Sequence, residues 1–249
     1  MHVEESEHAQ SEDASFIVHR SSFIVRATWA VFVKDMRAEL RNRYAINALL
    51  LFAVSTAVAV SLGVGPLSID RDNGDWLLVQ SSLLWIAILF AALNGLSRSF
   101  VQEEETGTAL ALRLAAPPVA VYAGKLLFNL ALLALLDAVT AALFALFVQI
   151  RIGTPVLFVA LLAAGSLALA ATTTILAAII ARASIKSALF AVLAFPLIVP
   201  LLVVAIQGTA LALAGEGWGR GWPYVQTLLA FAVAMLVASL LLFRVVWEA

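Results

Sequence analysis

Six long apolar segments fill the chain between about Tyr44 and Trp247, and they limit its fold more than any other feature. One helical crossing of a bilayer needs roughly 20 predominantly apolar residues. A β-barrel is excluded because its strands are only about ten residues of alternating polarity. We therefore predict an all-α membrane protein whose helices satisfy their own backbone hydrogen bonds. The predicted spans lie near residues 45–63, 76–97, 119–149, 156–181, 187–213 and 223–246.

The composition excludes a soluble globule. Hydrophobic residues make up 63% of the chain and charged residues 12%, about half of the roughly 25% that is usual in soluble domains. Cysteine is absent, and the three histidines, His2, His8 and His19, all precede the first apolar segment. We therefore expect neither a redox motif nor a metal site within the membrane.

The Lys and Arg residues fall almost entirely on alternate connections between the apolar segments. Only three lie on one side: Arg71, Arg151 and Arg220. Basic connections stay in the cytoplasm, so we predict that both termini are cytoplasmic. The twelve on the predicted cytoplasmic side are Arg20, Arg26, Lys34, Arg37, Arg41, Arg43, Arg98, Arg113, Lys125, Arg182, Lys186 and Arg244.

The chain begins with an acidic tail that has no apolar core and no cationic start. It is therefore not a signal peptide. We expect residues 1–21 to be disordered, 22–43 to form a separate helix, and 44–249 to form the six-helix membrane domain. The acidic residues of the tail are Glu4, Glu5, Glu7, Glu12 and Asp13.

Residues 22–43 have the period of an amphipathic helix that is too charged to span the membrane. On a helical wheel Lys34, Arg37 and Arg41 flank the apolar face on one side, and Asp35 and Glu39 flank it on the other. We predict a helix in the cytoplasmic interface, with its basic flank towards anionic lipid or a partner. The alternative is a solvated connector with chance amphipathicity. The apolar face consists of Val25, Trp29, Phe32, Val33, Met36 and Leu40.

A second charged stretch, from Arg98 to Lys125, carries three consecutive acidic residues and several helix-ending signals. Gly107 can end the incoming helix, Thr108 can cap a new one, and Pro117 with the following proline stops it. We predict a small helical knuckle at the inner surface, the alternative being a charged solvated loop. Its candidate coupling residues are Glu103, Glu104, Glu105, Gly107, Thr108, Arg113 and Pro117.

Three features of the apolar segments also bear on function. Asp137 is an acidic residue at membrane depth, which indicates either a functional group or a structural hydrogen bond. Pro196 and Pro200 predict a kink or break in the fifth span. Trp218 and Trp222, in a glycine-rich outer loop, are typical of an interfacial aromatic anchor.

The run from Trp85 to Phe100, followed by Glu103, Glu105, Gly107, Leu114, Pro117 and the pair Gly124-Lys125, resembles the CcmB family. The resemblance extends from about residue 28 to 210 and includes Glu39 to Arg43 and Phe195 to Pro200. CcmB is the membrane subunit of the ABC-type complex of cytochrome c maturation, often called the haem exporter. The sequence departs from the family at Ala170 to Thr174, where glycines are usual.

The resemblance implies an ABC-2-type permease fold in the bacterial plasma (inner) membrane. It implies three protein partners, namely a CcmA-like ATPase and CcmC-like and CcmD-like membrane subunits, together with membrane lipid and no nucleic acid. Haem, or a haem-loaded chaperone, would be the cargo, and we expect no resident cofactor on this chain. By similarity to other subunits of that system, Trp218 and Trp222 are also candidate outer contacts for haem.

ATP must be hydrolysed by another chain, because the only Gly-Lys pair, Gly124-Lys125, has Val119 where a phosphate-binding loop needs its first glycine. The chain is thus expected to be a transporter subunit and not an enzyme. Two alternatives stay open: a generic ABC-2-type exporter permease for a lipid, glycan or drug, and an assembly scaffold without a transport role.

Overall fold

The computed structural model describes residues 2–64, 74–96, 100, 103, 107–180 and 186–248. All regular elements in these ranges are helices, and six of them are long and apolar enough to cross a membrane. The predicted all-α membrane fold is confirmed. The six are α2 (Tyr44–Val64), α3 (Gly74–Leu96), α6 (Pro118–Leu143) with its π-helical continuation η1 (Phe144–Val148), α7 (Pro155–Ile180), α8 (Lys186–Leu213) and α9 (Trp218–Glu248).

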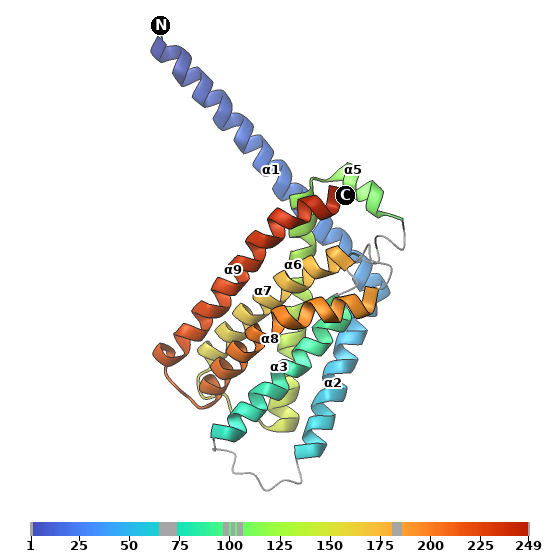
Figure 1. Cartoon of the computed structure of the whole chain (residues 1–249), viewed down its shortest axis with the longest axis vertical. Helices are drawn as coiled ribbons and strands as arrows, with labels where there is room; N and C mark the ends of the chain where they lie inside the picture. Colours follow the sequence, from blue (N-terminus) through green and yellow to red (C-terminus); the bar gives the residue numbers. More distant parts are fainter. Residues whose placement is uncertain are drawn as a thin grey trace.

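Two further helices of the described ranges lie at one end of this bundle. Figure 1 shows α5 (Ala109–Ala115) beside the C-terminus there, while α1 (His2–Asn42) runs across the same end and projects beyond it. We call this end of the molecule the α5 end. The turn between α8 and α9 lies at the opposite end, so both termini share one side, as six crossings require.

The helix α1 is longer than the sequence predicts. A single helix continues through residues 2–21, where we expected a disordered tail, and on through 22–42. Residues 2–42 contain neither glycine nor proline, so no residue in this range breaks the backbone hydrogen-bond ladder. The helix ends at Arg43, whose φ of 53° lies in the left-handed region.

The second half of α1 packs closely against the start of α6. A Cβ atom added to Gly124 would lie 2.7 Å from Cβ of Val31 and 2.8 Å from the carbonyl oxygen of Thr28. Val31 is accordingly buried. Since only glycine permits this approach, the Gly124-Lys125 pair sets the position of α1 on the bundle.

The centre of the bundle is organised around Trp85 of α3, which is completely buried. Its indole ring lies on Gly165 of α7, where any Cβ atom would overlap the ring. Its Nε1–H donates a hydrogen bond of 2.9 Å to Oγ1 of Thr209 on α8. One side chain thus links three spans, and the small residue opposite it makes the contact possible.

At the opposite end, the α6–α7 connection packs against the α8–α9 connection. Gly153 and Gly215 bring their backbones so close that a Cβ atom on Gly153 would overlap Gly215. The Thr154 backbone N–H donates to the Ala212 carbonyl at 2.9 Å, and the Thr154 hydroxyl donates to the Glu216 carbonyl at 2.8 Å.

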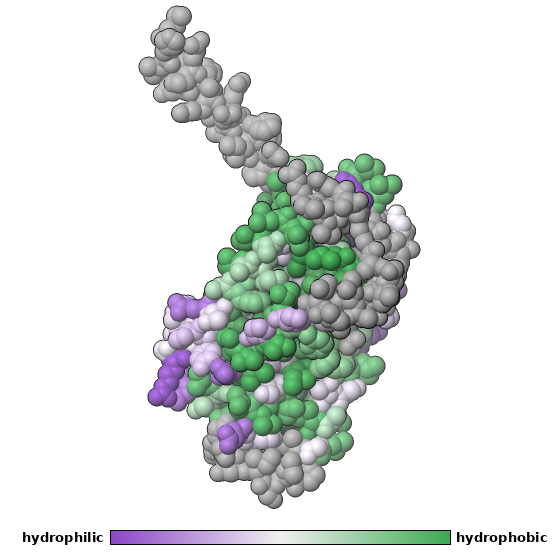
Figure 2. Space-filling view, viewed as in Figure 1, coloured by the Kyte–Doolittle hydropathy of each residue, from purple (hydrophilic) through white to green (hydrophobic). Residues whose placement is uncertain are grey.

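The last span begins earlier than predicted. We expected a loop up to about residue 222, but α9 starts at Trp218. Gly221 lies against Leu157 of α7, at a distance that excludes a side chain, so this glycine allows close helix packing here. The surface agrees with a membrane location: Figure 2 shows apolar residues over most of this face of the bundle and polar ones gathered near the α8–α9 turn.

We predict that Gly165→Ala destabilises the protein, because the added methyl group must displace an indole ring that is held by Thr209. Overpacking of this kind costs about 1–3 kcal/mol. Thermal unfolding in detergent measures the effect. The matched control is Gly63→Ala, since a Cβ atom at Gly63 meets nothing within 4 Å. Equal stability of the two variants would contradict the proposed role of this contact.

Candidate functional site

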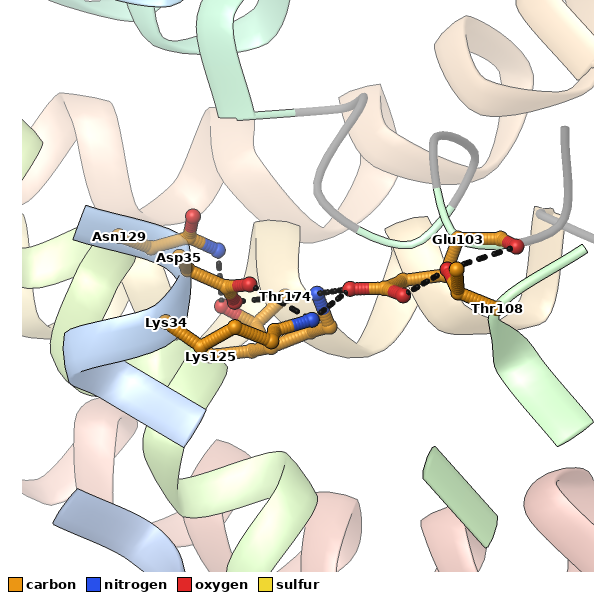
Figure 3. A network of polar contacts seen from close by, with 7 residues as sticks. All are labelled: Lys34, Asp35, Glu103, Thr108, Lys125, Asn129 and Thr174. Carbon is orange, nitrogen blue, oxygen red and sulfur yellow. Dashed lines mark hydrogen bonds and ion pairs between the residues drawn. The ribbon is translucent and has the colours of Figure 1, made fainter. Parts of the chain in front are cut away.

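A cluster of charged residues, buried except for Lys34, joins α1, α6 and the segment that leads to α5 (Figure 3). Lys125 of α6 lies at its centre, with Nζ 3.1 Å from Oδ2 of Asp35 and 3.2 Å from Oε1 of Glu103. Lys34 of α1 contacts the same Glu103 oxygen and lies 3.1 Å from Oδ1 of Asp35. We call these four residues the ion cluster.

The four described residues of the ion cluster bring two ammonium groups and two carboxylates together. The Lys125 side chain is only 1% exposed and the Glu103 side chain 9%, so neither charge is solvated by bulk water. Burying a charge is costly unless it is paired and hydrogen-bonded. Each member of the cluster therefore depends on the others, and removing one leaves an uncompensated charge in the protein.

The pKa of Glu103 reflects this arrangement. Burial alone would raise the pKa, but the positive charge of Lys125 and hydrogen bonds from Lys34 and Thr108 outweigh it and lower the pKa from 4.5 to about 2. For Lys34, burial lowers the pKa, and the opposing effects of Asp35 and Glu103 prevail, so its pKa is raised. Both residues are therefore charged at neutral pH.

Glu103 also holds the start of α5. The Thr108 hydroxyl donates to Oε2 of Glu103, and the Thr108 backbone N–H donates to the Glu103 carbonyl at 3.0 Å. Thr108 occupies the capping position of α5, as predicted, but its side chain makes no capping hydrogen bond because the hydroxyl is turned to Glu103. Gly107, with a φ of 69°, supplies the left-handed turn between them.

The other side of α5 is held by the end of α9. The Arg113 guanidinium lies 5.1 Å from the ring centroid of Trp247. Trp247 packs edge-on against Phe100 at 6.1 Å, and Phe100 in turn lies 5.1 Å from Nζ of Lys125. This aromatic group connects α5, α9 and the ion cluster.

Two leucines of α5 point away from these contacts. Leu110 is 66% exposed and Leu114 84%. They are four residues apart and therefore share one face of the helix. Leu112 and Arg113 contact the bundle, while Leu110 and Leu114 leave an apolar face of α5 uncovered, which is unusual for a solvated surface helix.

The family model described as CcmB protein matches residues 26–246. The chain belongs to the CcmB family. No match to a curated protein was found. Membership extends the resemblance seen in the sequence through α9, and it makes the chain a membrane permease subunit of the cytochrome c maturation system.

The acidic run that we predicted as a coupling site in this CcmB family member divides into two parts. Glu104 and Glu105 lie outside the described residues. Glu103 is buried and turned towards Lys34 and Lys125, so its carboxylate does not point outward as an exposed contact would. Pro117 caps the start of α6.

Asp137 lies at the interface of α6 and α7 and is 8% exposed. The Ser166 hydroxyl donates a hydrogen bond of 2.6 Å to Oδ2 of Asp137. Two turns closer to the α5 end, the Asn129 amide donates to Thr174 Oγ1 at 2.8 Å. Hydrogen bonds between polar side chains are a usual way of joining helices in lipid, so the contact agrees with the structural interpretation of Asp137.

The sequence predicts a kink or break at Pro196 and Pro200. The helix α8 is continuous from Lys186 to Leu213, so it is not broken there, and a kink at these prolines stays a prediction. Each proline removes a single backbone donor, and the rest of the ladder persists because lipid offers no other partner. Both rings are exposed on the surface of the bundle.

Trp218 and Trp222 lie on the first turns of α9, and they are 43% and 39% exposed. Their rings are stacked, with centroids 5.6 Å apart.

Sequence reasoning missed three of the residues that matter here: Asp35 and Lys125 as a pair, and Trp247. A signal was present for Lys125, because it is a cation that follows the close-packing Gly124 within a predicted span. No local signal identified Asp35 as its partner, which lies 90 positions away. No local signal singled out Trp247.

We predict that the pH dependence of stability is steeper in the wild-type protein than in Glu103→Gln. A carboxyl group whose pKa falls from 4.5 to about 2 on folding stabilises the folded state above its unfolded pKa by about 3 kcal/mol. This stabilisation is lost as the pH falls from about 5 to about 2. The free energy of unfolding in detergent, measured across this range, should show the difference between the two proteins shrinking in acid.

Glu216→Gln is the matched control, because Glu216 pairs with Arg220 on the surface, where such pairs contribute less than about 1 kcal/mol. A Glu103→Gln protein that matches this control at neutral pH would show that the ion cluster does not stabilise the fold.

Proposed function

We propose that this CcmB family member is driven by a separate ATPase that docks on α5, and that it passes the movement of that ATPase into the membrane helices. The observation that carries the proposal is the outward pair Leu110 and Leu114 on a helix that is anchored on both sides. A seven-residue helix is too short to be stable alone, so its anchoring is what fixes the leucines in place.

The anchors favour transmission of force over simple tethering. Glu103 connects the start of α5 to α1 and α6 through Lys34 and Lys125. Arg113 connects it to the end of α9. Because buried ion pairs and packed rings resist separation, a displacement of α5 would be shared by three helices.

The sequence supports assigning ATP hydrolysis to a different chain. The chain has no phosphate-binding loop, so ATP turnover belongs to a CcmA-like partner, with CcmC-like and CcmD-like subunits completing the complex. The only histidines precede the membrane domain, and the chain thus brings no obvious axial ligand for haem at membrane depth. We favour a role in ATP-driven release of a haem-loaded chaperone over direct passage of haem through this subunit.

We predict that Leu110→Asp combined with Leu114→Asp abolishes co-purification of the ATPase and maturation of c-type cytochromes. An apolar contact would be replaced by two carboxylates that must lose their hydration. Membrane insertion should survive because both positions lie outside the spans. The measurement is a pull-down of the ATPase together with haem staining of mature cytochrome.

Gly217→Asp is the control, since it adds a carboxylate at the opposite end, where a Cβ atom meets nothing within 4 Å. Full retention of the ATPase by the α5 variant, at normal protein levels, would refute docking through these leucines. Loss of both ATPase and protein from the membrane would instead assign the leucines a role in folding.

The proposal also requires that the α5 end faces the cytoplasm of a bacterial cell, with the protein in the inner membrane. Because the chain has no cysteine, single cysteines report orientation directly. We expect Gly217→Cys to react with an impermeant thiol reagent from the periplasm and Leu114→Cys to react only after the membrane is opened. The reverse pattern would overturn both the topology and the ATPase site.

A further inference from the structure

The charges of α1 are sorted between its two faces. In residues 22–42 the two carboxylates both turn inward: Asp35 pairs with Lys125, and Oε1 of Glu39 accepts the backbone N–H of Ile46 at 2.9 Å. The arginines Arg26, Arg37 and Arg41 are exposed. The charged groups on the outward surface of this part of α1 are therefore all basic.

These three arginines form no ion pair within the part of the chain that the structure describes. On the helical period of about 3.6 residues they occupy one sector of α1. Among the described residues no carboxylate neutralises these charges, in contrast to Lys34, which belongs to the ion cluster. An external anion is the natural counter-charge for such a group.

The sector next to the arginines is apolar and uncovered. Val25 is 68% exposed, Trp29 60% and Leu40 56%. Water would not favour so many bare apolar side chains on one short helix face. An exposed tryptophan beside arginines is the pattern of a helix that lies at a bilayer surface, with apolar side chains among the acyl chains and cations at the headgroups.

The placement of α1 fits this surface. Figure 1 shows α1 running across the α5 end of the bundle and not parallel to the spans. Contact with Gly124 at the first turns of α6 places the helix level with the membrane boundary. The leucines of α5 belong to a different element and are not part of this face.

We infer that the exposed face of α1, made of Arg26, Arg37 and Arg41 with Val25, Trp29 and Leu40, binds the headgroups of anionic phospholipids. An acidic partner protein could satisfy the arginines but would leave the apolar sector uncovered. A lipid surface satisfies both sectors at once. This inference is independent of the ATPase site, because none of its residues lies on α5.

The test uses the full chain purified in detergent, titrated with phosphatidylglycerol and, separately, with phosphatidylcholine. For the wild-type protein we expect phosphatidylglycerol to raise the thermal unfolding midpoint and phosphatidylcholine to have little effect. Added salt should weaken the difference because headgroup charges are screened. In the triple variant Arg26→Gln, Arg37→Gln, Arg41→Gln, each lost charge weakens binding by about fivefold, so affinity for phosphatidylglycerol should fall roughly a hundredfold.

The control is the double variant Arg151→Gln, Arg220→Gln, which removes exposed arginines at the opposite end and should retain the lipid response. A triple variant that still responds to phosphatidylglycerol like the wild type overturns the inference. If that same variant loses a co-purifying protein while keeping the lipid response, the face is a protein docking site and the lipid assignment is wrong. A separate variant, Trp29→Ser, should weaken the response of an otherwise stable protein.

Discussion

The buried ammonium group of Lys125 is the interaction on which the α5 end of this protein depends. It is out of reach of water and must be neutralised by the protein itself. Asp35 comes to it from α1 and Glu103 from the segment before α5, so the cation determines where two separate parts of the chain lie on the bundle. Its neighbour Gly124 makes the approach of α1 sterically possible. Charge and close packing at adjacent positions thus act together.

Within the described residues, the interior of the bundle is stabilised by close packing and hydrogen bonds and not by buried ion pairs. In lipid there is little hydrophobic gain from bringing two apolar helices together, so tight packing and hydrogen bonds between side chains dominate. Trp85 against Gly165, and Ser166 with Asp137, place both kinds of contact on the same turn of α7. The alanine- and threonine-rich stretch Ala170 to Thr174 is completely buried, so small residues other than glycine allow close packing there as well.

The six spans could be predicted from the sequence because their length and polarity are set by the thickness of the bilayer, which is a local constraint on each segment. The family could be predicted because its motifs are contiguous. The ion cluster could not, since the pairing of Lys125 with Asp35 depends on where two distant helices lie. Glu103 illustrates the problem: a glutamate in an acidic run is usually solvated, and only the position of the cations reveals that it is buried. The early start of α9 was missed for a related reason, because its glycines indicate a loop unless Leu157 is known to lie against Gly221.

The paired glycines at the opposite end have a mechanical consequence. Gly153 and Gly215 hold two interhelical connections together backbone to backbone, and Thr154 adds two hydrogen bonds across the joint. Four spans, α6 to α9, are therefore pinned at that end. Any separation of these helices must then be a splaying motion, widest at the α5 end and smallest at the glycine joint, which serves as the fulcrum. A force applied at α5 would act at the end far from the glycine joint, where the helices can move furthest.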